Sequence, residues 1–182
     1  RQFAIERGVR WTTDAQRRMM GMSSLEWAAY MHDELGVALE PGEIIAGVVD
    51  EMASRYRAHL PLLPGAVDAV RRLANRWPLA IASSANRPLI DLVLDEADLA
   101  GCFAVTLSTE EVGRGKPAPD VYLEAARRLA VTPARCSGVE DSSNGLRALR
   151  ANRDFPPDAD ALALADVVLS DLSELTVDVI DP

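Results

Sequence analysis

The sequence has 182 residues, which is long enough to bury a hydrophobic core in one domain or in a core with a small accessory unit. Hydrophobic residues make up 48% and aromatic residues 5%, so the composition excludes a disordered chain and is typical of a soluble α/β protein. The formal net charge of −9 argues against nucleic acid or an anionic membrane surface as a partner, because both require a basic face. A small phosphorylated ligand held by a local site stays compatible with this charge.

The cysteine content and the hydropathy favour a cytoplasmic protein. Cys102 and Cys136 lie beside apolar residues without metal-ligand spacing, so we expect buried, reduced thiols and no disulfide framework. No apolar run approaches the roughly 20 residues that a membrane helix needs. We therefore expect no membrane partner.

Residues 1–60 are predicted to form a small helical unit. The chain begins at Arg1, without an initiator Met. Its first residues are typical of the last turns of a helix that ends at Gly8, so we expect further residues before Arg1. Capping residues and helical spacing of apolar side chains predict further helices that begin near Thr13, Ser24 and Pro41.

The pattern changes at residues 60–65, where two prolines and a glycine mark a boundary between 1–60 and 61–182. Beyond it, helices and short apolar strands alternate. Helices are expected at 66–76, 88–99, 119–129 and from 145 to about 151, and strands at 79–82, 103–106 and 136–139. This alternation predicts an α/β fold, a Rossmann-like parallel sheet with helices on both sides.

The C-terminal part is less regular. We expect a short helix from Asp158, a short strand at 166–169 and a helical segment at 171–175.

Two adjacent carboxylates, Glu140 and Asp141, follow the third predicted strand at its turn into a helix. Carboxylate oxygens are hard ligands suited to Mg²⁺, and ligands of parallel sheets collect at the carboxyl ends of strands. An acidic residue followed by Ser is also typical of a helix N-cap, so the pair alone leaves both interpretations open.

Two further polar positions lie at comparable places. Ser83 and Ser84 follow the first strand, where a hydroxyl and backbone N–H groups can hold a phosphate or can cap the next helix. Lys116 lies in a loop with two glycines and two prolines, where it is either a point charge for a phosphoryl group or an ordinary surface lysine. Together with Glu140 and Asp141, these residues form a plausible phosphate site.

The same three segments carry a family resemblance. Ser83, residues 115–120 (Gly-Lys-Pro-Ala-Pro-Asp) and residues 138–142 (Gly-Val-Glu-Asp-Ser) resemble, in this order, the second, third and fourth motifs of the haloacid dehalogenase-like superfamily. The closest branch contains β-phosphoglucomutase and small sugar-phosphate phosphatases. The resemblance runs from the helical unit to the C-terminus.

The resemblance implies roles for four residues. Ser83 would hydrogen-bond the oxygens of the phosphoryl group that is transferred, and Lys116 would neutralise its charge and orient the nucleophile. Asp141, with Glu140 beside it, would help to hold Mg²⁺ directly or through water.

It also implies substrate contacts. Ser84 and Asn86 would lie near the substrate phosphate, and residues 1–60 would form a helical cap with Ser23 and Ser24 in its substrate-facing loop. The mutase has an Arg where Ser24 stands, and an Arg would grip a second phosphate. Its absence here favours a phosphatase over β-phosphoglucomutase.

Two departures from the family pattern matter. The family's first motif, an Asp-x-Asp that supplies the nucleophile and the general acid/base, does not occur before residue 60, and Asp158-Ala159-Asp160 is rejected because it follows two prolines and opens a helix. The helix that ends near Ala151 also meets Asn152 with no room for the glycine and strand expected there. We expect residues to be lacking at both places, and weak Mg²⁺ binding and no turnover until the first motif is restored.

Two functional hypotheses follow. The first is a Mg²⁺-dependent phosphatase or phosphotransferase that acts on a small phosphorylated metabolite, a sugar phosphate above all, through an aspartyl-phosphate. The second is a non-catalytic protein of the same fold that binds a ligand or partner with an incomplete site. A phospho-acceptor signalling domain is disfavoured, because its acidic pair precedes its Lys-Pro step, whereas the order here is reversed.

Overall fold

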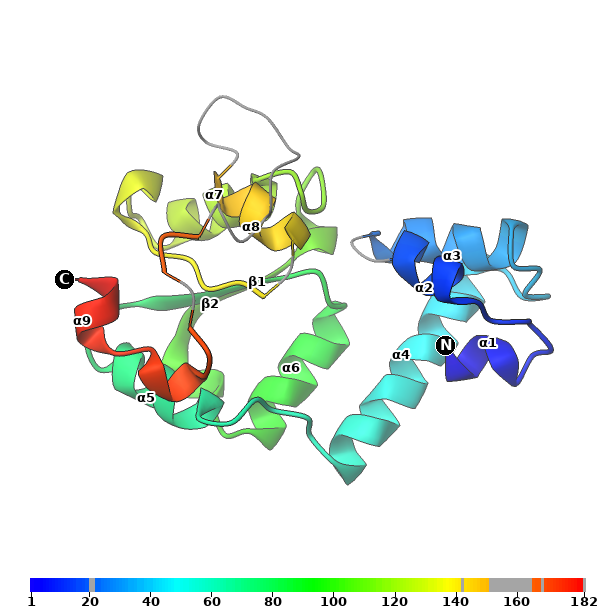
Figure 1. Ribbon diagram of the computed structural model, residues 1–182, viewed down its shortest axis with the longest axis horizontal. Helices are drawn as coiled ribbons and strands as arrows, with labels where there is room; N and C mark the ends of the chain where they lie inside the picture. Colours follow the sequence, from blue (N-terminus) through cyan, green and yellow to red (C-terminus); the bar gives the residue numbers. More distant parts are fainter. Residues whose placement is uncertain (20–21, 142, 151–164, 168, 182) are drawn as a thin grey trace. The chain divides into compact units, whose positions relative to one another are not determined.

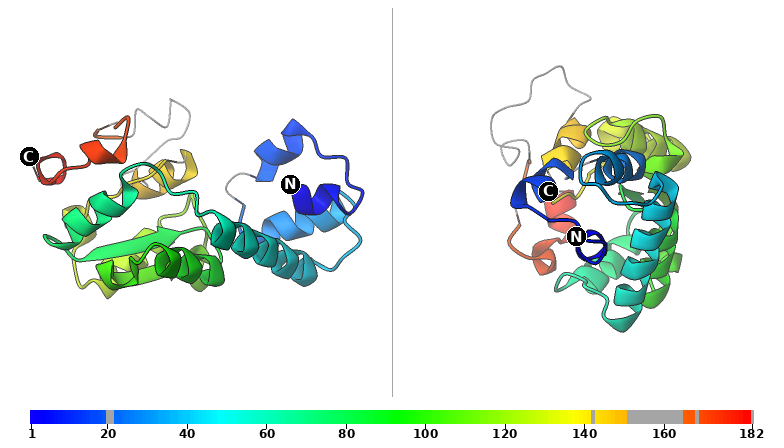
Figure 2. Two further views of the ribbon diagram at one scale, coloured as in Figure 1. Left: turned by 90° about the horizontal axis from the view of Figure 1, so that it is seen from below. Right: turned by 90° about the vertical axis from the view of Figure 1, so that its right-hand side faces the viewer.

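The computed structural model describes residues 1–19, 22–141, 143–150, 165–167 and 169–181. The chain divides into two compact units, Arg1–His59 and Leu60–Pro182 (Figures 1 and 2). Each unit has hydrophobic clusters of its own.

The first unit is helical, as predicted. Its helices are α1 (Gln2–Ile5), α2 (Thr13–Met19), α3 (Ser24–Asp33) and α4 (Pro41–Ala58). Gly8 follows α1 with φ of +81°, a conformation that glycine adopts without strain. A capping box of Ser23 and Glu26 starts α3, and Pro41 at the first turn starts α4.

The core of this unit forms where α1, α3 and α4 meet. Its buried members are Phe3, Ala4, Val9, Ala28, Met31, Val37 and Ile44. Gly47 permits the close approach of α1, because a Cβ at that position would lie 2.4 Å from the ring of Phe3.

The second unit alternates helices and strands. Its elements are α5 (Ala66–Ala74), β1 (Leu79–Ser83), α6 (Arg87–Glu96), β2 (Phe103–Ser108), α7 (Asp120–Arg128), α8 (Ser143–Arg150) and α9 (Val177–Ile180), with short 3-10 turns η1 (Ala100–Cys102), η2 (Thr109–Glu111), η3 (Pro133–Arg135) and η5 (Leu172–Glu174).

β1 and β2 are parallel neighbours, with Ala80 opposite Val105 and Ser83 opposite Ser108. Successive side chains of a strand point to opposite faces. Ala80 and Ala82 accordingly pack with α7 on one face, and Ile81 packs with α5 and α6 on the other. Figure 1 shows α7 on one side of the strands and α5 and α6 on the other. The predicted parallel α/β architecture with helices on both faces is confirmed.

The prediction of a third strand at 136–139 is wrong. This segment is in no strand, and Val139 is 58% exposed. A strand needs a neighbour for its N–H and C=O groups, which an apolar composition does not supply. Gly138 instead packs against α8, where a Cβ would lie 2.3 Å from Leu149.

The C-terminal predictions have mixed outcomes. Residues 165–167 and 169 are not in a strand, so the described part of the predicted strand 166–169 is wrong, and the segment 171–175 forms η5. Leu175 and residues around it pack on α5. The helix predicted from Asp158 and the Ala151–Asn152 junction lie outside the described residues.

Both thiols are free, but their predicted burial is wrong, since Cys136 is exposed and Cys102 is only partly covered. Among the described residues, no helix combines the length and apolar character needed to cross a bilayer.

Candidate functional site

The two strands end side by side, because the register pairs Ser83 with Ser108. Parallel strands place their carboxyl ends at one edge of the sheet, so the loops that follow β1 and β2 start together. The predicted residues Ser83, Ser84 and Asn86 lie in the first of these loops, and the second leads toward Lys116.

The first loop is shaped by Ser83. Its hydroxyl oxygen accepts a hydrogen bond from the backbone N–H of Ala85 at 3.0 Å, while the neighbouring Ser84 is exposed. The helix cap lies further on, at Asn86, which makes no side-chain cap bond. Ser83 therefore holds the strand-end turn and is not the N-cap of α6.

Asn86 is engaged by the second loop. Its side-chain amide donates to the carboxylate of Glu110 at 2.7 Å. The structure thus places Asn86 in the loop after β1 with an anionic neighbour, and its role beside a substrate phosphate stays a prediction.

Lys116 and Glu140 form a buried ion pair. Both side chains are only 8% exposed, and the Lys116 ammonium contacts Glu140 Oε1. The Tyr122 hydroxyl donates to the same oxygen at 2.7 Å, and Lys116 Nζ lies 4.9 Å from the centre of the Tyr122 ring. The structure therefore joins the loop of residues 115–120 to residues 138–142, two of the segments that the sequence analysis combined into one site.

The tyrosine in this cluster stays a hydrogen-bond donor. Burial, together with the nearby carboxylate of Glu140, raises the pKa of Tyr122 far above its usual range. A neutral phenol at this position neutralises no charge, so the ammonium of Lys116 is the cation that faces Glu140.

A glycine makes room for the carboxylate. A Cβ at Gly145, in the first turn of α8, would lie 1.9 Å from the carboxyl carbon of Glu140. A side chain there would drive Glu140 out of its position, so Gly145 and Glu140 belong to one arrangement.

Asp141, in contrast, is exposed. Its oxygens have the hard character that Mg²⁺ prefers, whereas Oε1 of Glu140 already accepts from two donors. Within the described ranges, no group of three or more His, Cys, Asp or Glu side chains could hold a metal ion. Asp141 therefore fits an Mg²⁺ site in chemistry, but a complete shell needs further ligands.

Ser23 and Ser24 lie in the other unit. The Ser23 hydroxyl caps α3 by accepting from the N–H of Glu26 at 3.4 Å, and Ser24 is buried. Their proposed contact with substrate stays a prediction.

Sequence reasoning missed Tyr122, Gly145 and the polar contacts between the two strand-end loops. Gly145 offered a signal, because a glycine at the start of a predicted helix indicates a close approach. Tyr122 and Arg87 offered none, since each lies on a helix with ordinary amphipathic spacing.

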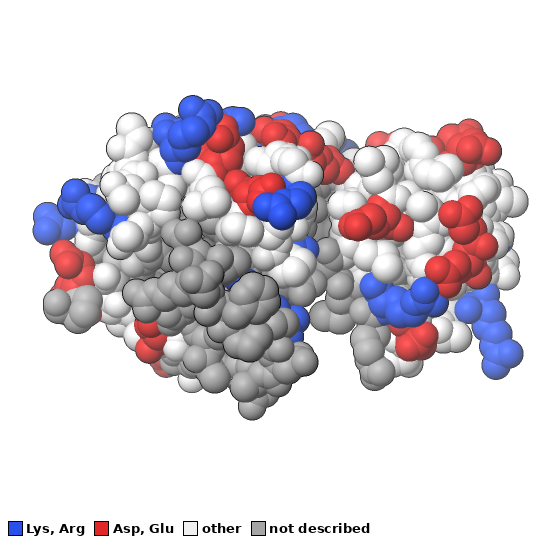
Figure 3. Space-filling view, turned by 90° about the horizontal axis from the view of Figure 1, so that it is seen from above, with Lys and Arg blue, Asp and Glu red and all other residues white. Residues whose placement is uncertain are grey.

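On the face drawn in Figure 3, acidic and basic side chains are interspersed in each unit.

A family model described as haloacid dehalogenase-like hydrolase matches residues 3–152. The chain belongs to this family. The resemblance inferred from Ser83 and from residues 115–120 and 138–142 is thereby confirmed.

Several of the relatives have phosphatase in their names. Hexitol phosphatase B of Escherichia coli (strain K12) is 36% identical over 143 residues, which are 74% of this chain and 64% of that protein. The bifunctional riboflavin kinase/FMN phosphatase of Arabidopsis thaliana is 29% identical over 153 residues, which are 83% of this chain and 40% of that protein. The chain thus spans less than two thirds of the length of either relative.

Solved structures share the fold. CbbY of Rhodobacter sphaeroides, solved with xylulose-(1,5)bisphosphate, has a TM-score of 0.82 at 23% identity, covering all of this chain and 89% of that one. A β-phosphoglucomutase of Clostridium difficile has a TM-score of 0.71 at 21% identity, covering 99% of this chain and 85% of that one.

Proposed function

We propose that the protein is a Mg²⁺-dependent phosphatase that acts on a small phosphorylated metabolite, with a sugar phosphate as the expected substrate class. The buried Lys116–Glu140 pair carries the proposal, because it fixes the ammonium of Lys116. The neighbouring Gly115 lies against Thr109, which follows the carboxyl end of β2. The phosphatases among the relatives support the reaction class.

The hydroxyl of Ser83 has the capacity that the reaction needs. A serine hydroxyl has one proton to donate and two lone pairs, and the N–H of Ala85 uses one lone pair. The O–H proton stays available for a phosphoryl oxygen, and the exposed loop at Ser84 would receive the phosphate.

Lys116 would offset the charge of the phosphoryl group. An ammonium group has three N–H donors, and the bond to Glu140 uses one of them. Glu140 and Tyr122 would hold the ammonium in place before the substrate arrives, which avoids reorganisation during the reaction.

The remaining chemistry is assigned by the family. A carboxylate oxygen of the first Asp of the family's Asp-x-Asp motif would attack phosphorus, the ester P–O bond would break, and the leaving oxygen would take its proton from the second Asp of that motif. Water would then release inorganic phosphate from the aspartyl-phosphate. Mg²⁺, held in part by Asp141, would neutralise charge on the phosphoryl oxygens.

The test measures phosphate release by the full encoded protein from a panel of sugar phosphates, with Mg²⁺ and with EDTA. We expect Mg²⁺-dependent release that Lys116→Ala, Ser83→Ala and Asp141→Asn each lower by about 100-fold or more. Asp141→Asn should also raise the Mg²⁺ concentration that gives half-maximal activity. Arg55→Ala, which removes an exposed ion pair with Glu51, is the control and should leave the rate unchanged.

Absence of hydrolysis across the panel would reject the phosphatase and favour the second candidate, a non-catalytic binding protein. One observation supports that candidate, since Glu140 by itself already neutralises Lys116. Interconversion of sugar phosphates without release of phosphate would instead indicate a β-phosphoglucomutase activity.

A further inference from the structure

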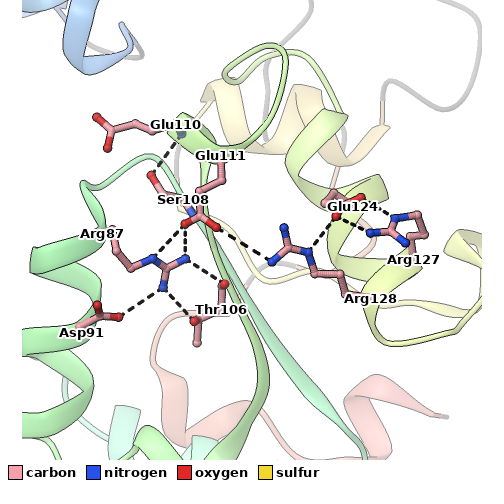
Figure 4. Close-up of polar contacts among 9 residues, drawn as sticks. All are labelled: Arg87, Asp91, Thr106, Ser108, Glu110, Glu111, Glu124, Arg127 and Arg128. Carbon is pink, nitrogen blue, oxygen red and sulfur yellow. Dashed lines mark hydrogen bonds and ion pairs between the residues drawn. The ribbon is translucent and has the colours of Figure 1, made fainter.

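A second polar cluster ties the two strand-end loops together. We call it the strand-end bracket and define it by Asn86, Arg87, Ser108, Glu110 and Glu111. Figure 4 shows Arg87 from the start of α6 meeting Glu111, which lies just after the end of β2.

Arg87 is the centre of the bracket. Its Nε donates to Glu111 Oε1 at 2.9 Å, and its Nη1 and Nη2 donate to the side chain and the carbonyl of Thr106 at 2.8 and 2.9 Å. Nη1 also contacts Asp91 at 3.3 Å. The guanidinium fork of α6 is thus fixed on β2 and on the turn that follows it.

Glu111 and Ser108 complete the link through backbone groups. Glu111 Oε1 also accepts from the N–H of Ser108 at 3.1 Å, and the Ser108 hydroxyl donates to the carbonyl of Ala85 at 2.7 Å. Asn86 adds its bond to Glu110. The loop after β1 is therefore held at three consecutive residues, 85–87, by the turn after β2.

The charges of the bracket are well matched. Burial alone would raise the pKa of Glu111, but the hydrogen bonds from Arg87 and from the Ser108 backbone outweigh it and hold the pKa below its usual range. Glu111 is therefore a carboxylate at neutral pH, and the bracket is a charge-assisted contact.

Along the sequence, the bracket residues lie between Ser83 and Lys116, the two residues proposed to contact the phosphoryl group. Ser83 precedes Arg87 by four residues, and Lys116 follows Glu111 by five. We infer that Arg87 and Glu111 are positioning residues, which set the loop of Ser83 against the loop that leads to Lys116. This inference rests on the proposed function, because the two loops need a fixed separation only if both contact one phosphoryl group.

The consequence is kinetic. Small displacements of groups that orient a reacting centre lower the rate steeply, even when the residue that moves them touches no substrate. Loss of the bracket should therefore lower kcat more than it raises KM.

The test uses the full encoded protein with para-nitrophenyl phosphate as the probe substrate. Glu111→Ala removes the acceptor, and Glu111→Gln keeps a neutral one. Asp98→Asn is the control, because Asp98 pairs with Arg71 at the surface and neither residue contacts the bracket in the described contacts. We expect Glu111→Ala to lower kcat about tenfold or more with KM changed less than about threefold. Glu111→Gln should restore most of the rate, and Asp98→Asn should match the wild type.

Amide hydrogen exchange supplies a readout that needs no activity. In Glu111→Ala, exchange should accelerate in peptides that contain residues 83–87 as well as in those that contain 109–116, while α5 keeps its protection. Arg87→Lys, which keeps the charge but loses the fork, should reproduce both effects if Glu111→Ala fails to fold.

The outcomes separate the two proposals. An active wild type with unchanged kcat in Glu111→Ala and Arg87→Lys overturns the inference and leaves the phosphatase intact. A tenfold loss in Asp98→Asn also overturns it, because the effect would not be specific to the bracket. An inactive wild type rejects the phosphatase, and unchanged exchange at 83–87 in Glu111→Ala then rejects the link between the loops as well.

Discussion

Lys116 stands out among single residues because it combines a long charged side chain with nearly complete burial. A buried ammonium is stable only with a counter-charge and hydrogen bonds, and Glu140 and Tyr122 supply these. The pair is therefore a joint feature of two motifs, and each partner depends on the other.

This dependence predicts a double-mutant result. Lys116→Met leaves Glu140 as an uncompensated buried carboxylate and should lower the free energy of unfolding by about 3 kcal/mol. Adding Glu140→Gln should recover part of this loss, because the charge is then gone. Urea unfolding at neutral pH measures both effects.

The control is Arg71→Met, which breaks an exposed pair with Asp98 in the same unit and should cost about 0.5 kcal/mol or less. Equal losses for Lys116→Met and Arg71→Met would show that the buried pair has no special weight.

Substitution of Gly145 should affect the stability of α8 and the placement of the Glu140 side chain in different ways. Alanine is a better helix former than glycine by about 1 kcal/mol, so Gly145→Ala favours α8 itself while its Cβ displaces Glu140. We expect Lys116 to become more reactive toward acetic anhydride, which peptide mass spectrometry measures, and phosphate release to fall.

Gly42→Ala in α4 is the matched variant, since a Cβ there meets nothing within 4 Å. It should gain helix stability and leave both the labelling of Lys116 and the activity unchanged. Unchanged labelling in Gly145→Ala would mean that Glu140 has room to adapt.

At the scale of elements, the sequence correctly predicted the helices and strands whose signals lie within a few neighbouring residues. The strands predicted at 79–82 and 103–106 occur as Leu79–Ser83 and Phe103–Ser108, because continuous apolar runs between turn residues indicate strands that are covered on both faces. Helix starts at Ser24 and Pro41 were likewise set by capping chemistry within a few residues.

Elements that depend on a partner could not be predicted. Residues 136–139 have the composition of a strand, but whether they pair is decided by the neighbouring backbone, which composition does not describe. The same limit applies to the site, where motif order indicated Ser83 and Lys116 but not the side chains of Tyr122 and Arg87 that hold their surroundings.

The bracket predicts an acid-sensitive link between α6 and β2. Because the pKa of Glu111 is depressed in the folded protein, its contribution is present above the unfolded pKa, about 4.3, and is lost as pH falls through the folded value. The difference in unfolding free energy between the wild type and Glu111→Gln should therefore shrink below about pH 4. Urea titrations at a series of pH values test this, and a difference that grows toward low pH would contradict it.

At the scale of the whole molecule, the described hydrophobic clusters each draw their members from one unit. The cluster around Ile44 lies within Arg1–His59, and the cluster around Leu107 lies within Leu60–Pro182. Two cores without shared members predict two cooperative units, each with an unfolding free energy of its own. The effects predicted for variants of Lys116 and Glu111 belong to Leu60–Pro182.

This organisation predicts that core truncations stay local. Ile44 and Leu107 are both 0% exposed. Ile44→Ala should lower the opening free energy of peptides from Arg1–His59 by about 3 kcal/mol and leave those from Leu60–Pro182 unchanged, and Leu107→Ala should do the reverse. Native-state hydrogen exchange read by peptide measures both units in one sample.

Leu25→Ala, at a position that is 72% exposed, is the surface control and should change neither unit by more than about 0.5 kcal/mol. If Ile44→Ala destabilised both units equally, the two cores would unfold as one, because only a shared cooperative transition transmits the loss across the boundary.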